Sequence, residues 1–121
     1  KSEIKKYGEG IIIGHSLGGI LAMQYLQNGG CPKQVMLVSA PYEKLDDIPV
    51  IEHFFTEDLH NTDFLFRLPG TSYQVFQSSD DPYVPQDHGE RWAKLLQVDL
   101  VLLSDRGHIN QDEFPEILDY L

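Results

Sequence analysis

The chain has 121 residues, of which ten are glycine, seven are proline and 41% are hydrophobic. This composition is typical of a single globular domain, and it excludes disordered and collagen-like chains. Nineteen acidic residues against nine lysines and arginines give a net charge of −10. Nucleic acid and anionic membrane surfaces are therefore unfavoured partners, because both polyanions would repel the chain.

Hydropathy and cysteine content suggest a compartment. No apolar run approaches the roughly 20 residues of a membrane span, and the first residues do not resemble a signal peptide. A single cysteine, Cys31, cannot form an internal disulfide or a cysteine-based zinc site. We therefore expect a cytoplasmic protein that does not bind to membranes.

The first part of the chain alternates between strand-like and helix-like segments. Residues 1–9 suggest the end of a helix, and the β-branched run at residues 10–14 predicts a strand that is buried on both faces. Residues 17–28 have helical periodicity and end in Asn-Gly-Gly. Residues 34–40 predict a second buried strand, which Pro41 closes.

A long middle segment, residues 42–70, separates the second strand from the third. Apolar residues recur at helical spacing within residues 50–59, and a second apolar cluster spans residues 64–68. We expect its phenylalanines to lie in a core or a subunit contact. The whole segment is also a possible cap over an active site.

The rest of the chain continues the alternation. Residues 73–77 predict a third strand, residues 85–97 a helix, residues 98–104 a fourth strand and residues 112–121 a last helix. An order of strand, helix, strand and helix predicts one α/β domain with a mostly parallel sheet and flanking helices.

A G-x-S-x-G sequence at residues 14–18 lies between the first strand and the first full helix. A strand that turns at once into a helix holds Ser16 at a strained, positive φ and exposes its hydroxyl; such a turn is called a nucleophile elbow. We expect a side chain at Gly14 or Gly18 to clash, and Gly19 to allow close approach of helix and strand. The backbone N–H of Leu17 would donate to a developing oxyanion.

A serine hydroxyl needs a base, so one of the five histidines must lie near it. His108 follows Gly107 in a loop after the fourth strand, and active sites lie at the carboxyl ends of parallel strands. We therefore predict His108 as the base. His15 is expected to be a packing or hydrogen-bonding neighbour, and His88 a structural histidine on the inner face of its helix.

The remaining histidines imitate a metal site. His53, Glu57 and His60 share a helical face at spacings of four and three. No ligand motif surrounds them and the segment is acidic, so we predict a solvated face. No metal and no cofactor are expected.

A third residue must orient the imidazole. Asp80 and Asp81 both follow the third strand, and spacing alone does not separate them; Asp105 is a further candidate. The order serine, aspartate and histidine along the chain is the order of α/β-hydrolases.

Residues 79–85 (SDDPYVP), together with Gly107-His108, resemble α/β-hydrolases, and most closely the small serine hydrolase family of the retinoblastoma-binding type. In α/β-hydrolases the acid commonly opens a D-x-x-V-P run, so the resemblance selects Asp81. It implies an esterase or amidase that acts on a small-molecule ester or amide through a Ser16, His108 and Asp81 triad.

Members of this family have further strands before the elbow, whereas fifteen residues precede Ser16 here. We therefore expect either the carboxyl-terminal part of a larger protein or a reduced form of the fold. The strand that borders the missing half would be an unpaired edge, which favours self-association. The alternative function is a catalytically inactive protein-binding module on the same scaffold.

Overall fold

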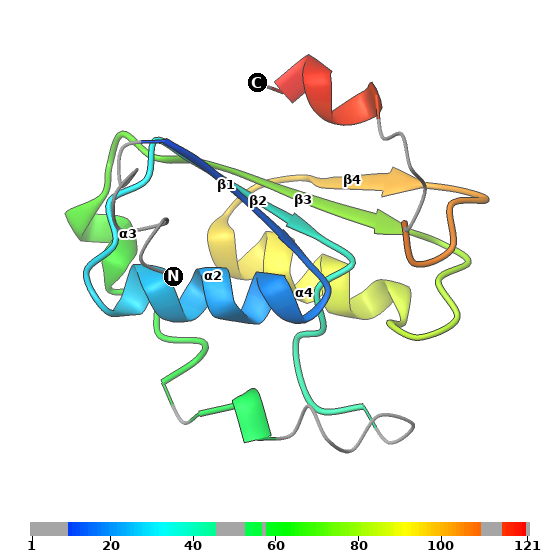
Figure 1. Ribbon diagram of the computed structural model, residues 1–121, viewed down its shortest axis with the longest axis horizontal. Helices are drawn as coiled ribbons and strands as arrows, with labels where there is room; N and C mark the ends of the chain where they lie inside the picture. The colour runs from blue at the N-terminus through cyan, green and yellow to red at the C-terminus, as the bar shows by residue number, and fades with distance from the viewer. Residues whose placement is uncertain (1–9, 46–52, 57, 110–114, 121) are drawn as a thin grey trace.

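Strands and helices alternate along the chain in a computed structural model that describes residues 10–45, 53–56, 58–109 and 115–120 (Figure 1). The elements, in chain order, are β1 (Ile11–His15), α2 (Leu17–Gln27), β2 (Gln34–Val38), α3 (Phe64–Arg67), β3 (Ser72–Ser78), α4 (Gln86–Leu96), β4 (Leu100–Leu103) and a 3-10 helix, η2 (Pro115–Tyr120). Most of the predicted elements are present, with bounds that differ by one or two residues.

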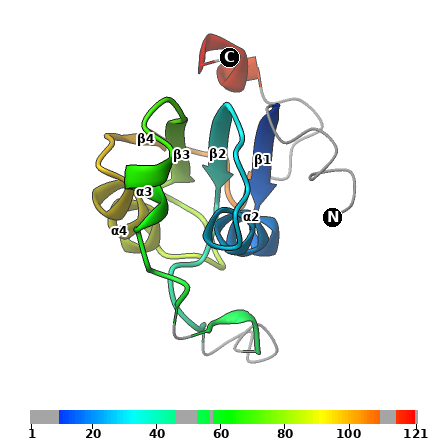
Figure 2. The same cartoon turned by 90° about the vertical axis from the view of Figure 1, so that its left-hand side faces the viewer.

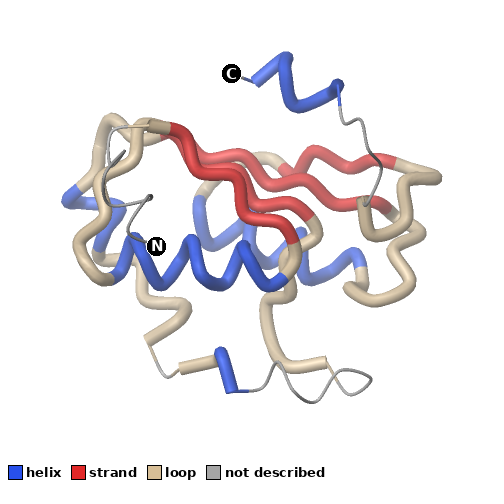
Figure 3. Tube along the Cα trace, viewed as in Figure 1, coloured by secondary structure: helices blue, strands red, loops and turns tan. Residues whose placement is uncertain are grey.

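The four strands form one parallel sheet in the order β1-β2-β3-β4 (Figure 3). Ile13 of β1 lies opposite Met36 of β2, and Met36 lies opposite Gln74 of β3. Because all strands run the same way, the loops after their carboxyl ends gather at one edge of the sheet. The predicted α/β fold with a parallel sheet is confirmed.

Helices α2 and α4 cover one face of the sheet, and η2 lies on the opposite side (Figures 1 and 2). The main core lies between α2, α4 and the sheet, and its fully buried side chains include Ile20, Met23, Val35, Leu37 and Trp92. A smaller cluster on the other face contains Met36, Val38, Phe76 and Ile109. The sheet is thus packed on both faces at its centre.

Burial of the two first strands differs. All five residues of β2 are buried, as its unbroken apolar run predicts. The same prediction is wrong for β1, because Ile11 and Ile13 are 46% and 52% exposed. β1 lies at the edge of the sheet, and no described element covers these two side chains.

The described parts of the middle segment and of the chain end are less helical than their patterns suggest. Within the described part of residues 50–59, His53 and Phe54 form a short 3-10 turn and no α-helix is present. The second apolar cluster forms the four-residue α3, in which Phe64 is buried and Phe66 is 88% exposed, so of the expected core or subunit contact only the subunit contact is left for Phe66. The described end of the predicted last helix is the 3-10 helix η2.

Two other predictions cannot be compared with the structure, since residues 1–9 and 46–52 lie outside the described residues. In the part of the chain that is described, no helix combines the length and the apolar character needed to cross a membrane.

Candidate active site

Ser16 occupies the turn between β1 and α2. Its backbone has φ 56° and ψ −121°, so the predicted positive φ is present. The Ser16 N–H donates to the carbonyl of Val38 at 2.8 Å, and the Ser16 carbonyl accepts from the Gly19 N–H at 2.9 Å. These two bonds hold a backbone conformation that is unfavourable for a non-glycine residue.

The glycines around Ser16 have different roles. A Cβ at Gly14 would lie 2.5 Å from the backbone oxygen of Gly18, and a Cβ at Gly19 would lie 2.5 Å from the Cβ of Ala40. These two glycines are required for close packing of helix against strand. The predicted clash at Gly18 is wrong, because a Cβ there would meet no atom within 4 Å.

His108 lies between Ser16 and Asp81. Its Nε2 is 2.9 Å from Ser16 Oγ, and its Nδ1 is 2.8 Å from Asp81 Oδ2. The carboxylate can only accept, so Nδ1 carries the proton and Nε2 of the neutral ring is free to accept from the serine hydroxyl. The Asp81 side chain is fully buried and that of His108 is 12% exposed.

The Asp81 carboxylate is oriented by the turn that it begins. Its Oδ1 accepts hydrogen bonds from the backbone N–H groups of Tyr83 at 2.8 Å and Val84 at 2.9 Å. This is the local chemistry that favours aspartate at the start of a turn. It leaves Oδ2 directed at the imidazole.

Asp80 points elsewhere, although it is the neighbour of Asp81. Its Oδ1 accepts from the Ser78 hydroxyl at 2.5 Å and from the Gly107 N–H at 3.1 Å. The Ser78 hydrogen bond, followed by that of Gly107, lowers the pKa of the Asp80 carboxyl. Asp81 is thus the acid on the imidazole, whereas Asp80 contacts the loop that carries His108. The other candidate, Asp105, is exposed.

Leu17 is the first residue of α2, and the first N–H groups of a helix have no acceptor within the helix. The positive end of the helix dipole is therefore next to Ser16. A donor at this position suits an oxyanion that forms on a carbonyl attacked by Ser16.

The other histidines make structural contacts. His15 Nε2 is 2.7 Å from the backbone oxygen of His108. His88 is buried, and its Nδ1 accepts from the Tyr42 N–H at 2.9 Å. Burial lowers the pKa of His88.

The helical-face residues that resemble a metal site, His53, Glu57 and His60, are not all exposed to solvent as predicted. His53 is exposed, but His60 is half-buried and stacks on Tyr42 with ring centroids 4.0 Å apart. The prediction of a solvated face is therefore wrong for His60. Glu57 lies outside the described residues, and no group of potential metal ligands is found in the described ranges.

A hollow lies on the far side of Tyr83 from His108, and none of Ser16, Asp81 and His108 lines it. The ring of Tyr83 meets the His108 ring edge-on with centroids 5.4 Å apart, and Tyr83 also lines the hollow. The residues that surround it come from the loops after β2 and β3 and from α4: Glu43, Lys44, Leu45, Pro82, Tyr83, Pro85 and His88. Sequence patterns do not single out Tyr83, although it lies within residues 79–85, which carry the resemblance to α/β-hydrolases.

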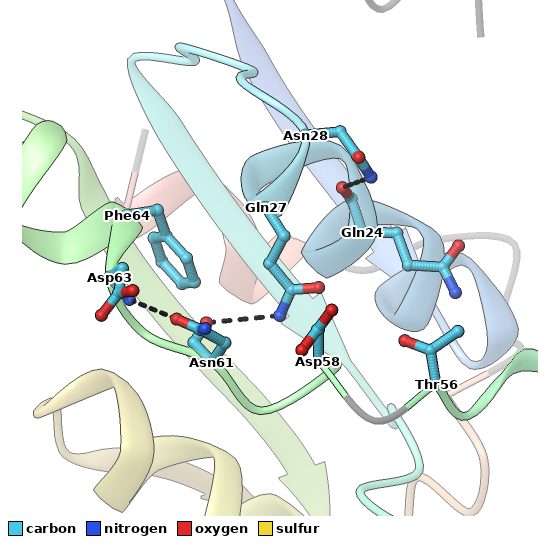
Figure 4. Close-up of a pocket in the computed structure, with 8 residues that line it drawn as sticks. All are labelled: Gln24, Gln27, Asn28, Thr56, Asp58, Asn61, Asp63 and Phe64. Atoms are coloured by element: carbon cyan, nitrogen blue, oxygen red, sulfur yellow. Dashed lines mark hydrogen bonds between the residues drawn. The ribbon is translucent and has the colours of Figure 1, made fainter.

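A second hollow lies along the carboxyl-terminal half of α2 and, like the first, is lined by none of Ser16, Asp81 and His108 (Figure 4). Gln24 Nε2 donates to the Phe54 carbonyl at 3.0 Å, and Gln27 Nε2 donates to the Asn61 carbonyl at 3.3 Å. These amides attach the middle segment to α2. The hollow is therefore part of that attachment and is separate from the candidate active site.

Comparison with known proteins identifies the family of the chain. The sequence model of a family described as serine hydrolase matches residues 1–119. Serine hydrolase RBBP9 of Rattus norvegicus is 28% identical over 108 residues, which are 89% of this chain and 57% of that protein. The chain thus spans little more than half the length of this relative.

Solved structures share the fold. The ydeN gene product of Bacillus subtilis superposes with a TM-score of 0.81 at 19% identity, over 98% of this chain and 68% of that one. A meta-cleavage product hydrolase from Pseudomonas fluorescens superposes with a TM-score of 0.59 at 13% identity, over 95% and 62% of the two chains. At these identities the likeness shows the α/β-hydrolase fold alone. By the family match, the chain belongs to the serine hydrolase family.

Proposed function

We propose that this member of the serine hydrolase family cleaves a carboxylic ester or amide through an acyl-enzyme, with Ser16 as nucleophile, His108 as base and Asp81 as the orienting acid. One observation carries the proposal: the continuous hydrogen-bond chain from Ser16 Oγ through His108 to Asp81, with links of 2.9 and 2.8 Å. Links of this length are what proton transfer from a serine hydroxyl requires.

In the first step Ser16 Oγ attacks the substrate carbonyl carbon, and the hydroxyl proton passes to His108 Nε2. The buried carboxylate of Asp81 stabilises the imidazolium that forms. Negative charge develops on the carbonyl oxygen, to which the Leu17 N–H would donate. His108 then returns the proton to the leaving alcohol or amine, which departs from the acyl-enzyme.

In the second step a water molecule takes the place of the leaving group. His108 accepts one proton from the water as it attacks the acyl carbon, and the carboxylic acid is released when Ser16 Oγ recovers its proton. No metal or redox group enters this sequence.

The hollow beside Tyr83 would receive a group of the substrate next to the bond that is cleaved. Leu45, Pro82 and Pro85 give it an apolar wall, and Glu43 and Lys44 add one charge of each sign, so a small group without net charge would fit it. The net charge of −10 also disfavours strongly anionic substrates.

Labelling with a fluorophosphonate probe tests the proposal, because the probe reacts with activated serines. The wild-type chain should be labelled, and Ser16→Ala and heat-denatured chain should not. Folding is checked by the fluorescence of Trp92, the single tryptophan, which is fully buried. A folded chain that is not labelled would contradict the proposal and favour a protein-binding module without activity.

A further inference from the structure

The turn that carries His108 has an unfavourable backbone. Asp105, Gly107 and Ile109 have φ values of 59°, 58° and 55°. Glycine adopts this region without cost, but an isoleucine does so rarely because its branched Cβ crowds the backbone. Strained residues of this kind persist only where surrounding contacts hold them.

Two contacts position the carboxyl-terminal end of the turn. The Ile109 side chain is buried in the smaller core cluster, and His15 Nε2 lies 2.7 Å from the backbone oxygen of His108. Neither contact involves the residues that precede His108. The Ile109 N–H donates to the Arg106 carbonyl at 2.9 Å and closes the turn, while the amides of Arg106 and Gly107 have partners outside it.

Ser78 and Asp80 are those partners. The Arg106 N–H donates to Ser78 Oγ at 3.1 Å, and the Ser78 hydroxyl donates to Asp80 Oδ1 at 2.5 Å. The same carboxylate oxygen accepts from the Gly107 N–H at 3.1 Å. Ser78 is fully buried at the end of β3, and it connects the exposed Asp80 to the amide of Arg106.

We propose that Asp80, together with Ser78, is a positioning residue for His108. Ser78 holds the amide of Arg106 and Asp80 holds that of Gly107, and these two bonds hold the imidazole between Asp81 and Ser16. Asp80 touches no reacting atom. Its expected effect on reaction rate rests on the proposed function, since it acts through His108. Displacement of a catalytic group by about 1 Å can cost about 100-fold in rate, so a loose turn would be measurable.

The test compares two substitutions at Asp80 in the full chain. Asp80→Ala removes the acceptor for both Ser78 and Gly107, and the rate of fluorophosphonate labelling should fall by roughly 10- to 100-fold. Asp80→Asn keeps an oxygen acceptor and should restore the rate to within about threefold of the wild type. Asp99→Ala is the matched control, because it removes an exposed aspartate ahead of β4.

A second readout does not need turnover. In proton NMR spectra of the wild type, the Nδ1–H of His108 should give a low-field signal, and the amides of Arg106 and Gly107 should exchange slowly. Asp80→Ala should broaden or remove the signal and speed both exchange rates. If Asp80→Ala does not fold, Ser78→Ala is measured in the same way, and loss of protection at Arg106 supports the proposal.

The outcomes separate the two proposals. A wild type that is not labelled, but whose low-field signal depends on Asp80, contradicts the proposed function and supports the positioning role. Unchanged labelling and unchanged amide exchange in Asp80→Ala would overturn the positioning role. So would an Asp80→Asn variant as impaired as Asp80→Ala, since charge and not hydrogen bonding would then be the cause.

Discussion

At the scale of single residues, Asp80 and Asp81 show how two adjacent carboxylates acquire different tasks. The side chain of Asp81 is fully buried and faces an imidazole, with its second oxygen occupied by two backbone N–H groups. Asp80 faces a serine hydroxyl and the amide of Gly107. The two residues are of the same type, and their different hydrogen-bond partners give them different tasks. Asp81 orients the imidazole of His108, and Asp80 positions the loop that carries it.

The first prediction uses this difference. Asp81→Asn should lower kcat/KM for an ester substrate by about 10²–10⁴-fold, because an amide cannot stabilise the imidazolium and favours the wrong tautomer of His108. Asp80→Asn should lower it by no more than about threefold. Steady-state kinetics at one pH check both variants. Equal losses in the two would show that the acids share one task.

The glycines of the elbow give a second prediction. Gly14→Ala should destabilise the fold by about 1–3 kcal/mol or more, because the new Cβ would meet the backbone at Gly18 and Gly19. Gly18→Ala should be neutral or stabilise by up to ~1 kcal/mol, since the site is open and helical. Urea unfolding followed by Trp92 fluorescence measures both. A large loss in Gly18→Ala would contradict the geometry of the turn.

At the scale of elements, α4 attaches the loop after β2 to the core through His88 and Trp92. His88 Nδ1 accepts from the Tyr42 N–H, and Trp92 Nε1 donates to the carbonyl of Pro41 at 3.1 Å. Both rings are buried. The helix thus fixes the start of the segment that leaves β2 beside the candidate active site.

The contact of His88 predicts a pH dependence of stability. Burial lowers its pKa from the ordinary 6.5, with Asp87 and Glu43 opposing the shift and Arg91 adding to it. Below pH 6.5 the unfolded chain therefore binds a proton that the folded chain does not. This contribution to stability is complete above that pH and falls as the pH drops toward the lowered pKa.

The midpoint of urea unfolding is measured at one pH above 6.5 and at a second pH about one unit below 6.5. The wild type should lose more stability than His88→Gln, whose side chain does not titrate but can still accept from the Tyr42 N–H. Equal losses in both proteins would assign the pH dependence to other groups.

Apolar runs and helical periodicity predict an element correctly where the fold buries the residues that the pattern makes apolar. The apolar run of β2 is buried on both sides, and the helical period of α4 places His88, Trp92 and Leu96 inside. The run of β1 looks the same in sequence but lies at an edge. Whether a neighbour covers a strand is decided by tertiary structure, so periodicity does not report it.

The residues of the candidate active site also fall into those that the sequence predicts and those that it does not. Ser16 and His108 follow from the strand-turn-helix motif and from loops at strand ends, and resemblance selected Asp81. The attachment of Arg106 and Gly107 to Ser78 and Asp80 has no local signal, because these two hydrogen bonds join residues that are 28 and 27 positions apart. Such contacts become visible only when β3 and β4 are placed side by side.

At the scale of the whole molecule, the two faces of the sheet are covered unequally. α2 and α4 cover one face (Figure 2). On the other face, Ile11 and Ile13 of β1 are about half exposed. Among the described strands β1 pairs with β2 alone. An edge strand with exposed apolar side chains is a template for pairing with a second chain.

We therefore predict self-association through β1. Ile13→Thr keeps a β-branched residue but removes apolar area, so it should reduce the associated fraction in sedimentation velocity and change stability by less than about 0.5 kcal/mol. Phe66→Thr is the control, because Phe66 is exposed on α3 and away from the edge strand.

Raising the ionic strength should strengthen association of the wild type, since salt screens the repulsion between chains of charge −10. An equal effect of both substitutions would assign association to general surface hydrophobicity, and a monomeric wild type at high salt would show that β1 does not pair.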